Sequence, residues 1–448
     1  MKKFVFCAVS VILCLIFAFP ANAYQITQYE MHHEAGMVIF LDNEQDVTIY
    51  EKNADKKMYP AAITRLMTAI ILIENVSDLE NTKLVYTEYA NNLILGTGSA
   101  VLGLKVGEEI SAKDALAAML VSSSGDVGYA IAEYVGGSKE GFAKLMNQKA
   151  AELGLENTHF VDPIGLHDDN HYTTARDIYK LASVAFDNKV IKDLCSVTYY
   201  KVAATNMSDE RSVITSNMML NASTNVYYKY ADAGKTGYTE KAGRCIVTTG
   251  TYNGYEYMVI VLNAKTPGGV RNDFKDAANM FRWAFNNFEY KMVFEPNTPV
   301  TEAKIKLARD TDFLPICFEN GLEALLPKNA NASTLDFEIH LNKAEFSAPV
   351  KKGEVVGTAD IYYAEEKIGT VNLVAGQTIK ASFWLTVFDF ATNFFTSPFM
   401  IVIYCILGIA LVVFGCWISA LNKGKKKRRK VRYIPLSKEK YNDFDDKY

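Results

Sequence analysis

The stretch ADAGKTGYTEKAGRC, residues 231–245, does most to decide the fold. Lys235, Thr236 and Gly237 stand shortly before an apolar run that starts at Cys245. On an edge strand, this triplet would present a cation and a hydroxyl to a cleft, and its glycine would leave an extended peptide free to pair with the strand. The triplet is common, and alone it is equally typical of a polar turn, so its interpretation depends on the rest of the chain.

Two earlier stretches supply that context. YPAAITRLMTA (59–69) reads as the start of a helix, and MLVSSSGDVGYAIAEYVGGS (119–138) places Ser123 before a second helix. In this order and spacing, the three stretches resemble the S-x-x-K, S-x-N and K-T-G motifs of penicillin-recognising serine enzymes. The segments GLKVGEEISAKDALAAML (103–120) and NTHFVDPIGLHDDNHYTTARDI (157–178) narrow the resemblance to the D-alanyl-D-alanine carboxypeptidases of peptidase family S11.

The resemblance implies an α/β (α+β) domain of the serine β-lactamase and transpeptidase type, followed by a small all-β domain. Strand-like and helical patterns alternate up to about residue 295, where short β runs take over. The first and last strand patterns of the α/β part lie far apart in sequence, and a sheet that pairs them would bring the ends of that domain together.

The chemistry of the family depends on residues that this chain lacks. Ala62 stands at the position of the nucleophilic serine, and Arg65 stands at the position of the lysine base. A methyl group cannot attack a carbonyl, and a guanidinium keeps its proton at ordinary pH and offers no acceptor. The second motif retains Ser123 but has Gly125 where the family has asparagine. Thr64 is the nearest hydroxyl in the first motif, yet on a helix it points about 200° away from the expected direction.

The two ends of the chain carry membrane signals. Residues 1–23 combine two lysines, an apolar run and Ala21-Asn22-Ala23, which predicts a cleaved secretory signal, although an uncleaved anchor stays open. Residues 399–421 are uncharged and long enough to span a bilayer, and the basic block from Lys423 places the C-terminus in the cytoplasm. Residues 383–395 carry aromatics at helical spacing, which predicts a helix at the membrane surface.

The predicted organisation therefore has six parts. They are a signal peptide (1–23), a carboxypeptidase-like domain (24–295), a β-rich domain (296–381), an amphipathic interfacial segment (382–398), a transmembrane helix (399–421) and a basic cytoplasmic tail (422–448). This organisation predicts a single-pass protein of a bacterial cell membrane whose large domains lie outside the cytoplasm.

Net charge and cysteine spacing argue against two other kinds of protein, nucleic-acid binders and metal-binding proteins. A net charge of −4 argues against a nucleic-acid binder. Cys195, Cys245 and Cys317 are the cysteines outside the signal and the span, and they show no metal-ligand spacing. His32 and His33 are adjacent, and we expect neighbouring side chains to point apart. The sequence therefore predicts neither a metal site nor a cofactor.

The favoured hypothesis is a membrane-anchored pseudoenzyme. It would bind peptidoglycan stem peptides that end in D-alanine, through Lys235, Thr236 and Gly237, or scaffold other cell-wall enzymes. The alternative is an active D-Ala-D-Ala carboxypeptidase with a non-standard nucleophile, such as Ser123. A third interpretation gives the β domain or the span a protein–protein role that does not involve the cleft.

Overall fold

The computed structural model describes residues 26–42 and 46–429. The predicted signal peptide and the end of the predicted cytoplasmic tail lie outside the described residues. The chain forms two units, the first with the residues up to Lys291 together with Ala324–Ala330, and the second with Met292–Glu323 and everything from Asn331 on. Each unit is described by itself.

The elements up to residue 287, with 3-10 turns written as η, are β1 (Ala35–Leu41), β2 (Val47–Lys52), η1 (Ala61–Thr64), α2 (Arg65–Asn75), β3 (Lys83–Val85), α3 (Glu88–Ile94), β4 (Glu109–Ser111), α4 (Ala112–Val121), α5 (Gly125–Gly136), α6 (Lys139–Glu152), α7 (Ala175–Asp187), α8 (Lys189–Ser196), β5 (Tyr199–Val202), β6 (Arg211–Ile214), η2 (Met218–Leu220), β7 (Ala231–Thr239), β8 (Gly243–Tyr252), β9 (Tyr255–Ala264), η3 (Pro267–Gly269) and α9 (Asn272–Asn287). The elements that follow are β10 (Phe288–Phe294), β11 (Pro299–Lys306), β12 (Phe313–Phe318), β13 (Leu322–Pro327), η4 (Ala332–Thr334), β14 (Leu335–Leu341), β15 (Glu345–Ser347), β16 (Val355–Tyr363), β17 (Glu366–Ala375), α10 (Phe383–Phe395) and α11 (Pro398–Arg429).

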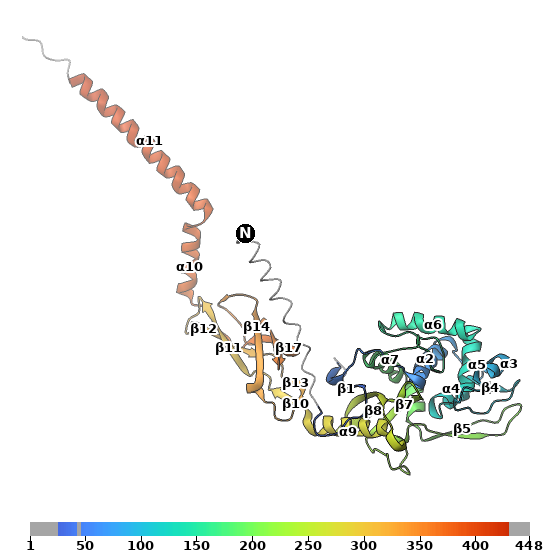
Figure 1. Ribbon diagram of the computed structural model, residues 1–448. Coiled ribbons are helices and arrows are strands. Elements are labelled where there is room, and N and C mark those ends of the chain that lie inside the picture. Colours follow the sequence, from blue (N-terminus) through green and yellow to red (C-terminus); the bar gives the residue numbers. More distant parts are fainter. Residues whose placement is uncertain (1–25, 43–45, 430–448) are drawn as a thin grey trace, which may run out of the picture. The chain divides into compact units, whose positions relative to one another are not determined.

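A five-stranded antiparallel sheet organises the first unit (Figure 1). Its strand order is β2-β1-β9-β8-β7, so the first strand of the chain pairs with β9, the last strand of this sheet in sequence. β7, which carries Lys235, lies at the sheet edge and pairs only with β8 among the described strands. The motif triplet therefore has a strand on one side and an open strand edge on the other.

Alternating side chains of the central strands enter two different cores. Met37 and Ile39 of β1 pack with the helices α2, α4, α5 and α7, whereas Val38 and Phe40 pack against α9. This is the period of two expected for a strand buried on both faces. Helices therefore cover both faces of the sheet, with α9 alone on one of them.

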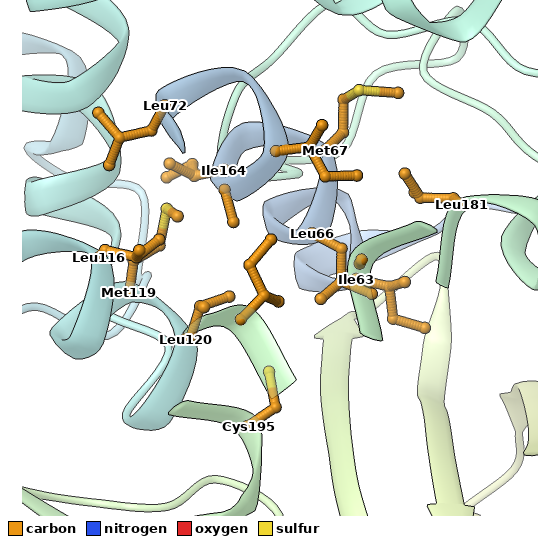
Figure 2. Packing of buried hydrophobic residues seen from close by; sticks show 14 of the residues in the cluster. Ile63, Leu66, Met67, Leu72, Leu116, Met119, Leu120, Ile164, Leu181 and Cys195 are labelled. Carbon is orange, nitrogen blue, oxygen red and sulfur yellow. The ribbon is translucent and has the colours of Figure 1, made fainter. Parts of the chain in front are cut away.

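Helix α2 is the centre of the larger core. Arg65–Leu72 are all buried, and Leu66 and Met67 are packed among Leu120, Ile164 and Leu181 (Figure 2). An amphipathic helix of a globular protein buries only one stripe, whereas a helix buried all round lies inside the core. The side chain at position 65 is therefore inside the protein rather than on its surface.

The second unit contains the predicted β-rich domain. Its six-stranded sheet has the order β14-β16-β17-β12-β11-β15, in which β11 and β15 are parallel and the other pairs are antiparallel. The short β runs that the sequence predicts here, 303–307, 335–341, 354–363 and 367–374, correspond to β11, β14, β16 and β17. β12, β13 and β15 lie outside these predicted runs.

Two helices follow this sheet. α10 begins and ends at the residues that the aromatic spacing predicts, and its aromatic side chains, including Trp384 at 77% exposed, are open to solvent. In the described part of the chain, one helix is long and apolar enough to cross a membrane, over Pro398–Asn422. The structure contains no membrane, so the crossing itself stays a prediction.

Candidate functional site

The first motif forms a 3-10 turn rather than the first turn of an α-helix. η1 covers Ala61–Thr64, and Ala61 has a φ of 47°. The turn is wedged between two glycines: a Cβ at Gly165 would lie 2.0 Å from the Ala61 carbonyl oxygen, and one at Gly237 would lie 2.9 Å from the Ala62 nitrogen. Glycine at 237 is thus required by this close approach, which is a different reason from the peptide access that the sequence suggests.

The side chain of Arg65 lies in the interior of the protein, where all three of its nitrogens donate hydrogen bonds. Its side chain is 3% exposed, and its Nε donates to the Ile164 carbonyl oxygen at 3.0 Å. One terminal nitrogen donates to the Ser123 carbonyl oxygen and the other to Ser99 Oγ at 3.2 Å. Burial lowers the pKa of the guanidinium to about 10, so it remains charged near neutral pH. Arg65 therefore joins α2 to three separate loops.

The second motif is the loop between α4 and α5, and α5 is the helix that the sequence predicts after Ser123. Ser123 breaks the helix because its φ is 61°, in the left-handed region that few non-glycine residues adopt. A Cβ at Gly125 would lie 2.6 Å from Ser99 Oγ and 2.9 Å from the Cδ1 atoms of Ile94 and Ile164. An asparagine side chain at this position is incompatible with the present placement of Ser99.

The third motif contributes a buried amine. Lys235 is fully buried, and its Nζ lies 2.6 Å from Ser123 Oγ and 3.3 Å from the Thr236 carbonyl oxygen. Burial, with a further contribution from the nearby charge of Arg65, lowers the pKa of Lys235 to about 7. Thr236 Oγ1 bonds to Ser216 Oγ at 2.9 Å. The structure therefore brings the three predicted motifs together, with the amine enclosed beneath the hydroxyls.

The positive charges of Arg65 and Lys235 have no directly paired carboxylate among the described residues. The nearest acids, Asp126 and Asp162, accept hydrogen bonds from backbone N–H groups and from Tyr129 instead. Two buried cations without a counter-ion make a site that favours an anion.

Ser99 and Ser216 are also part of the site, although neither belongs to a motif and only the tertiary structure brings them there. The adjacent histidines differ from their prediction as well. Nδ1 of His32 and Nδ1 of His33 both bond to the carboxylate of Asp276, at 3.0 and 2.9 Å. The two side chains converge on one acid, contrary to the expectation that they point apart.

One group of possible metal ligands occurs among the described residues, and it belongs to the second unit. Glu338, His340 and Asp360 have ligand atoms within 4.8 Å of one another. Lys367 Nζ already lies 2.8 Å from Asp360, which balances part of the negative charge. This exposed cluster is explained by that ion pair without a metal, and the prediction of no metal site stays a prediction.

Fold and site together define the class of serine enzymes that recognise penicillin. A family model for D-alanyl-D-alanine carboxypeptidase matches residues 24–266, and one for the C-terminal domain of penicillin-binding protein 5 matches residues 288–381. The first match covers more than half of the 448 residues. The chain therefore belongs to the D-alanyl-D-alanine carboxypeptidase family, peptidase S11.

Individual relatives agree with this assignment. The chain is 27% identical over 360 residues to the D-alanyl-D-alanine carboxypeptidase DacF of Bacillus subtilis, covering 80% of this chain and 89% of that one. It is 27% identical over 385 residues to DacC of Escherichia coli, covering 84% and 92%. The solved structure of DacD from Francisella tularensis shares the fold, with a TM-score of 0.60 at 24% identity over 82% of this chain and 98% of that one.

Proposed function

We propose that this protein is a membrane-anchored, catalytically silent member of its family that binds peptidoglycan stem peptides ending in D-alanine. The observation that carries the proposal is the pair of buried basic side chains, Arg65 and Lys235, which lie beside a first motif whose Ala62 supplies no nucleophile. The terminal carboxylate would be received by the hydroxyls of Ser123 and Thr236, above the charge of Lys235. The open edge of β7 would hydrogen-bond the extended peptide.

The anchoring part of the proposal rests on the C-terminal helices. α11 would cross the membrane once, α10 would lie at its outer surface, and the large units would lie outside the cytoplasm. In this position the protein would meet the wall directly, and it would be able to hold other cell-wall enzymes near their substrate.

A direct binding measurement tests the proposal. The full chain in detergent micelles is titrated with a synthetic peptide that ends in D-alanyl-D-alanine, and with the same peptide closed by a C-terminal amide. We expect reversible, saturable binding of the acid, at least tenfold weaker binding of the amide, and loss of binding in Lys235→Ala. Equal affinity for acid and amide would show that the cations do not recognise the carboxylate.

A second candidate function is hydrolysis with Ser123 as the nucleophile. The 2.6 Å contact between Ser123 Oγ and Lys235 Nζ favours it, because a lysine with a pKa of about 7 is neutral in part of the population and can take a proton from the hydroxyl. Labelling with a fluorescent penicillin separates the two candidates.

Under the favoured proposal, the wild type stays unlabelled, and the double variant Ala62→Ser with Arg65→Lys becomes labelled. Under the second candidate, the wild type is labelled and Ser123→Ala is not. A role that bypasses the cleft predicts that peptide binding is absent in all of these proteins.

A further inference from the structure

Residues 378–382 connect β17 to α10 in the second unit, and backbone pairing holds them on both sides. Ile379 forms an antiparallel bridge with Val350, and Ala381 forms one with Ala308. α10 begins directly after this segment. The base of the helix is therefore fixed to the β-rich domain.

Four basic residues lie on this bridged segment and beside it: Arg309, Lys351, Lys352 and Lys380, all of them exposed. We call this cluster the basic platform. Arg309 lies opposite Lys380, because its N–H donates to the Lys380 carbonyl oxygen at 3.2 Å. The N–H of Lys352 donates to Thr378 Oγ1 at 3.0 Å, which holds the other two lysines beside the start of the segment. Backbone pairing thus brings together cations from three stretches that are separate in the sequence.

The basic platform has few counter-charges. Its three lysines form no ion pair with any described residue, and Arg309 has only the neighbouring Asp310, 3.7 Å away. The carboxylate of Glu354 accepts the backbone N–H of Lys351 at 3.1 Å and is the other acid beside the cluster. Like charges that lie opposite each other on paired strands repel. An external anion would therefore relieve the repulsion between Arg309 and Lys380.

The helix that follows is apolar on its surface. The aromatic side chains of Phe383, Trp384 and Phe388 are exposed, and a helix with such a surface is typical of insertion at the boundary between lipid headgroups and acyl chains. Lys380 precedes Phe383 by three residues, which span at most about 10 Å of extended chain. When the aromatics enter a bilayer, the basic platform therefore reaches the depth of the headgroups.

We propose that the basic platform binds the phosphate headgroups of anionic lipids at the surface where α10 inserts. The guanidinium of Arg309 can hold a phosphate through two parallel N–H donors, and the three ammonium groups add point charges around it. A soluble anionic polymer would satisfy the same charges but would leave the aromatic surface of α10 uncovered, so a bilayer accounts for both features. The inference rests on the proposed placement of α10 at the membrane and adds a preference for negatively charged lipid.

The test uses the full chain reconstituted into nanodiscs of phosphatidylcholine alone, or of an equal mixture with phosphatidylglycerol. Acylation of each lysine by acetic anhydride is followed by mass spectrometry. We expect Lys351, Lys352 and Lys380 to react at least about threefold more slowly in the mixed nanodiscs, and high salt to remove the difference. Lys367, at the opposite end of β17, should react at the same rate in both lipids.

Charge removal separates the basic platform from a general effect of net charge. The double variant Arg309→Gln with Lys380→Gln should lose at least half of the protection of Lys351 and Lys352. The matched control, Lys144→Gln with Lys241→Gln, also removes two exposed charges but lies in the first unit, and it should keep the full protection.

Equal acylation rates in the two lipids, or equal protection in the two double variants, would overturn the inference. Protection by soluble polyphosphate with none by phosphatidylglycerol would assign the basic platform to a soluble polymer instead. Quenching by brominated phosphatidylcholine, compared between wild type and Trp384→Phe, reports the placement of α10 separately. Quenching that depends on Trp384, with unprotected lysines, would contradict the lipid contact and leave the placement of α10 standing. Protected lysines without this quenching would uphold the lipid contact and contradict the placement.

Discussion

Gly125 and Arg65 are linked through the side chain of Ser99. The guanidinium of Arg65 holds Ser99 Oγ at 3.2 Å, and that same oxygen occupies the space in which a Cβ at position 125 would lie. The arginine in the first motif and the glycine in the second are therefore parts of one packing arrangement.

The shared contact with Ser99 predicts that substitutions at positions 99 and 125 have non-additive effects on the free energy of unfolding. Gly125→Ala should destabilise the protein by about 1–3 kcal/mol, because the methyl group overpacks a filled interior. Combining it with Ser99→Ala should cost at least about 0.5 kcal/mol less than the sum of the two single changes, since the nearest clash is removed. Thermal unfolding of the four proteins measures this, with exposed Ser223→Ala as the additive control. Strict additivity with Ser99→Ala would contradict the linkage.

The lowered pKa of Lys235 predicts how peptide binding depends on pH. A bound carboxylate favours the charged amine, and the free protein holds this charge only below its pKa of about 7. Affinity for the acid peptide should therefore be highest below pH 7 and should fall by up to about tenfold per pH unit above it. Titrations between pH 5.5 and 9 check this, with the amide peptide as the control. Affinity that rises with pH would contradict the assignment.

At the scale of elements, the N-terminal segment is fastened to α9 by one buried carboxylate. Asp276 of α9 accepts the backbone N–H groups of His32 and His33 as well as both imidazole Nδ1 atoms. Burial alone would raise the pKa of Asp276, but the hydrogen bonds from His33 and His32 hold it below its usual value. This clamp sets the start of β1 at the sheet, close to the end of β9, whose Leu262 carbonyl oxygen accepts the Glu34 N–H.

Asp276→Asn should lower the free energy of unfolding by about 2–4 kcal/mol, because an amide has only one oxygen for four donors and leaves buried groups unpaired. In the wild type, the contribution of the clamp is fully present above the unfolded pKa of about 3.9 and is lost as the pH falls through the lower folded value. Unfolding at pH 7 and at pH 3 measures both effects. If the difference in free energy of unfolding between variant and wild type did not narrow at pH 3, the Asp276 carboxylate would not be the source of the stabilisation.

Local patterns predict some strand boundaries and not others. The run from Arg244 to Ala264 is two strands, β8 and β9, joined by Asn253 and Gly254, both with positive φ. An Asn-Gly pair between apolar runs is a hairpin signal, so this break was predictable. β12 contains Pro315, which argues against a strand, and its pairing with β11 and β17 overrode that local preference.

At the scale of the whole molecule, the proposed membrane attachment would be divided between the two C-terminal helices. A variant that ends at Ser382 should be soluble, and one that ends at Ser397 should bind vesicles reversibly through the exposed aromatics of α10. The full chain should stay with the membrane after alkaline extraction. Vesicle flotation distinguishes the three proteins. Flotation of the variant that ends at Ser382 would show that another surface carries the attachment.

The sequence alone located the three motifs and the two C-terminal helices, and it shows that the methyl group of Ala62 cannot act as a nucleophile. These features are local, because they rest on residue chemistry and on the helical hydrophobic period of 3.6. The fold class and the β-rich second domain followed from the family that the motifs resemble.

The tertiary structure decided which groups Arg65, Lys235 and the two adjacent histidines contact. The partners of Arg65 lie 34, 58 and 99 residues away in the chain, and no periodicity connects them. The low pKa of Lys235 arises from burial, and the convergence of His32 and His33 arises from an acid more than 240 residues away. Contacts of this range are set by the packing of whole elements, so they appear only once the chain is folded.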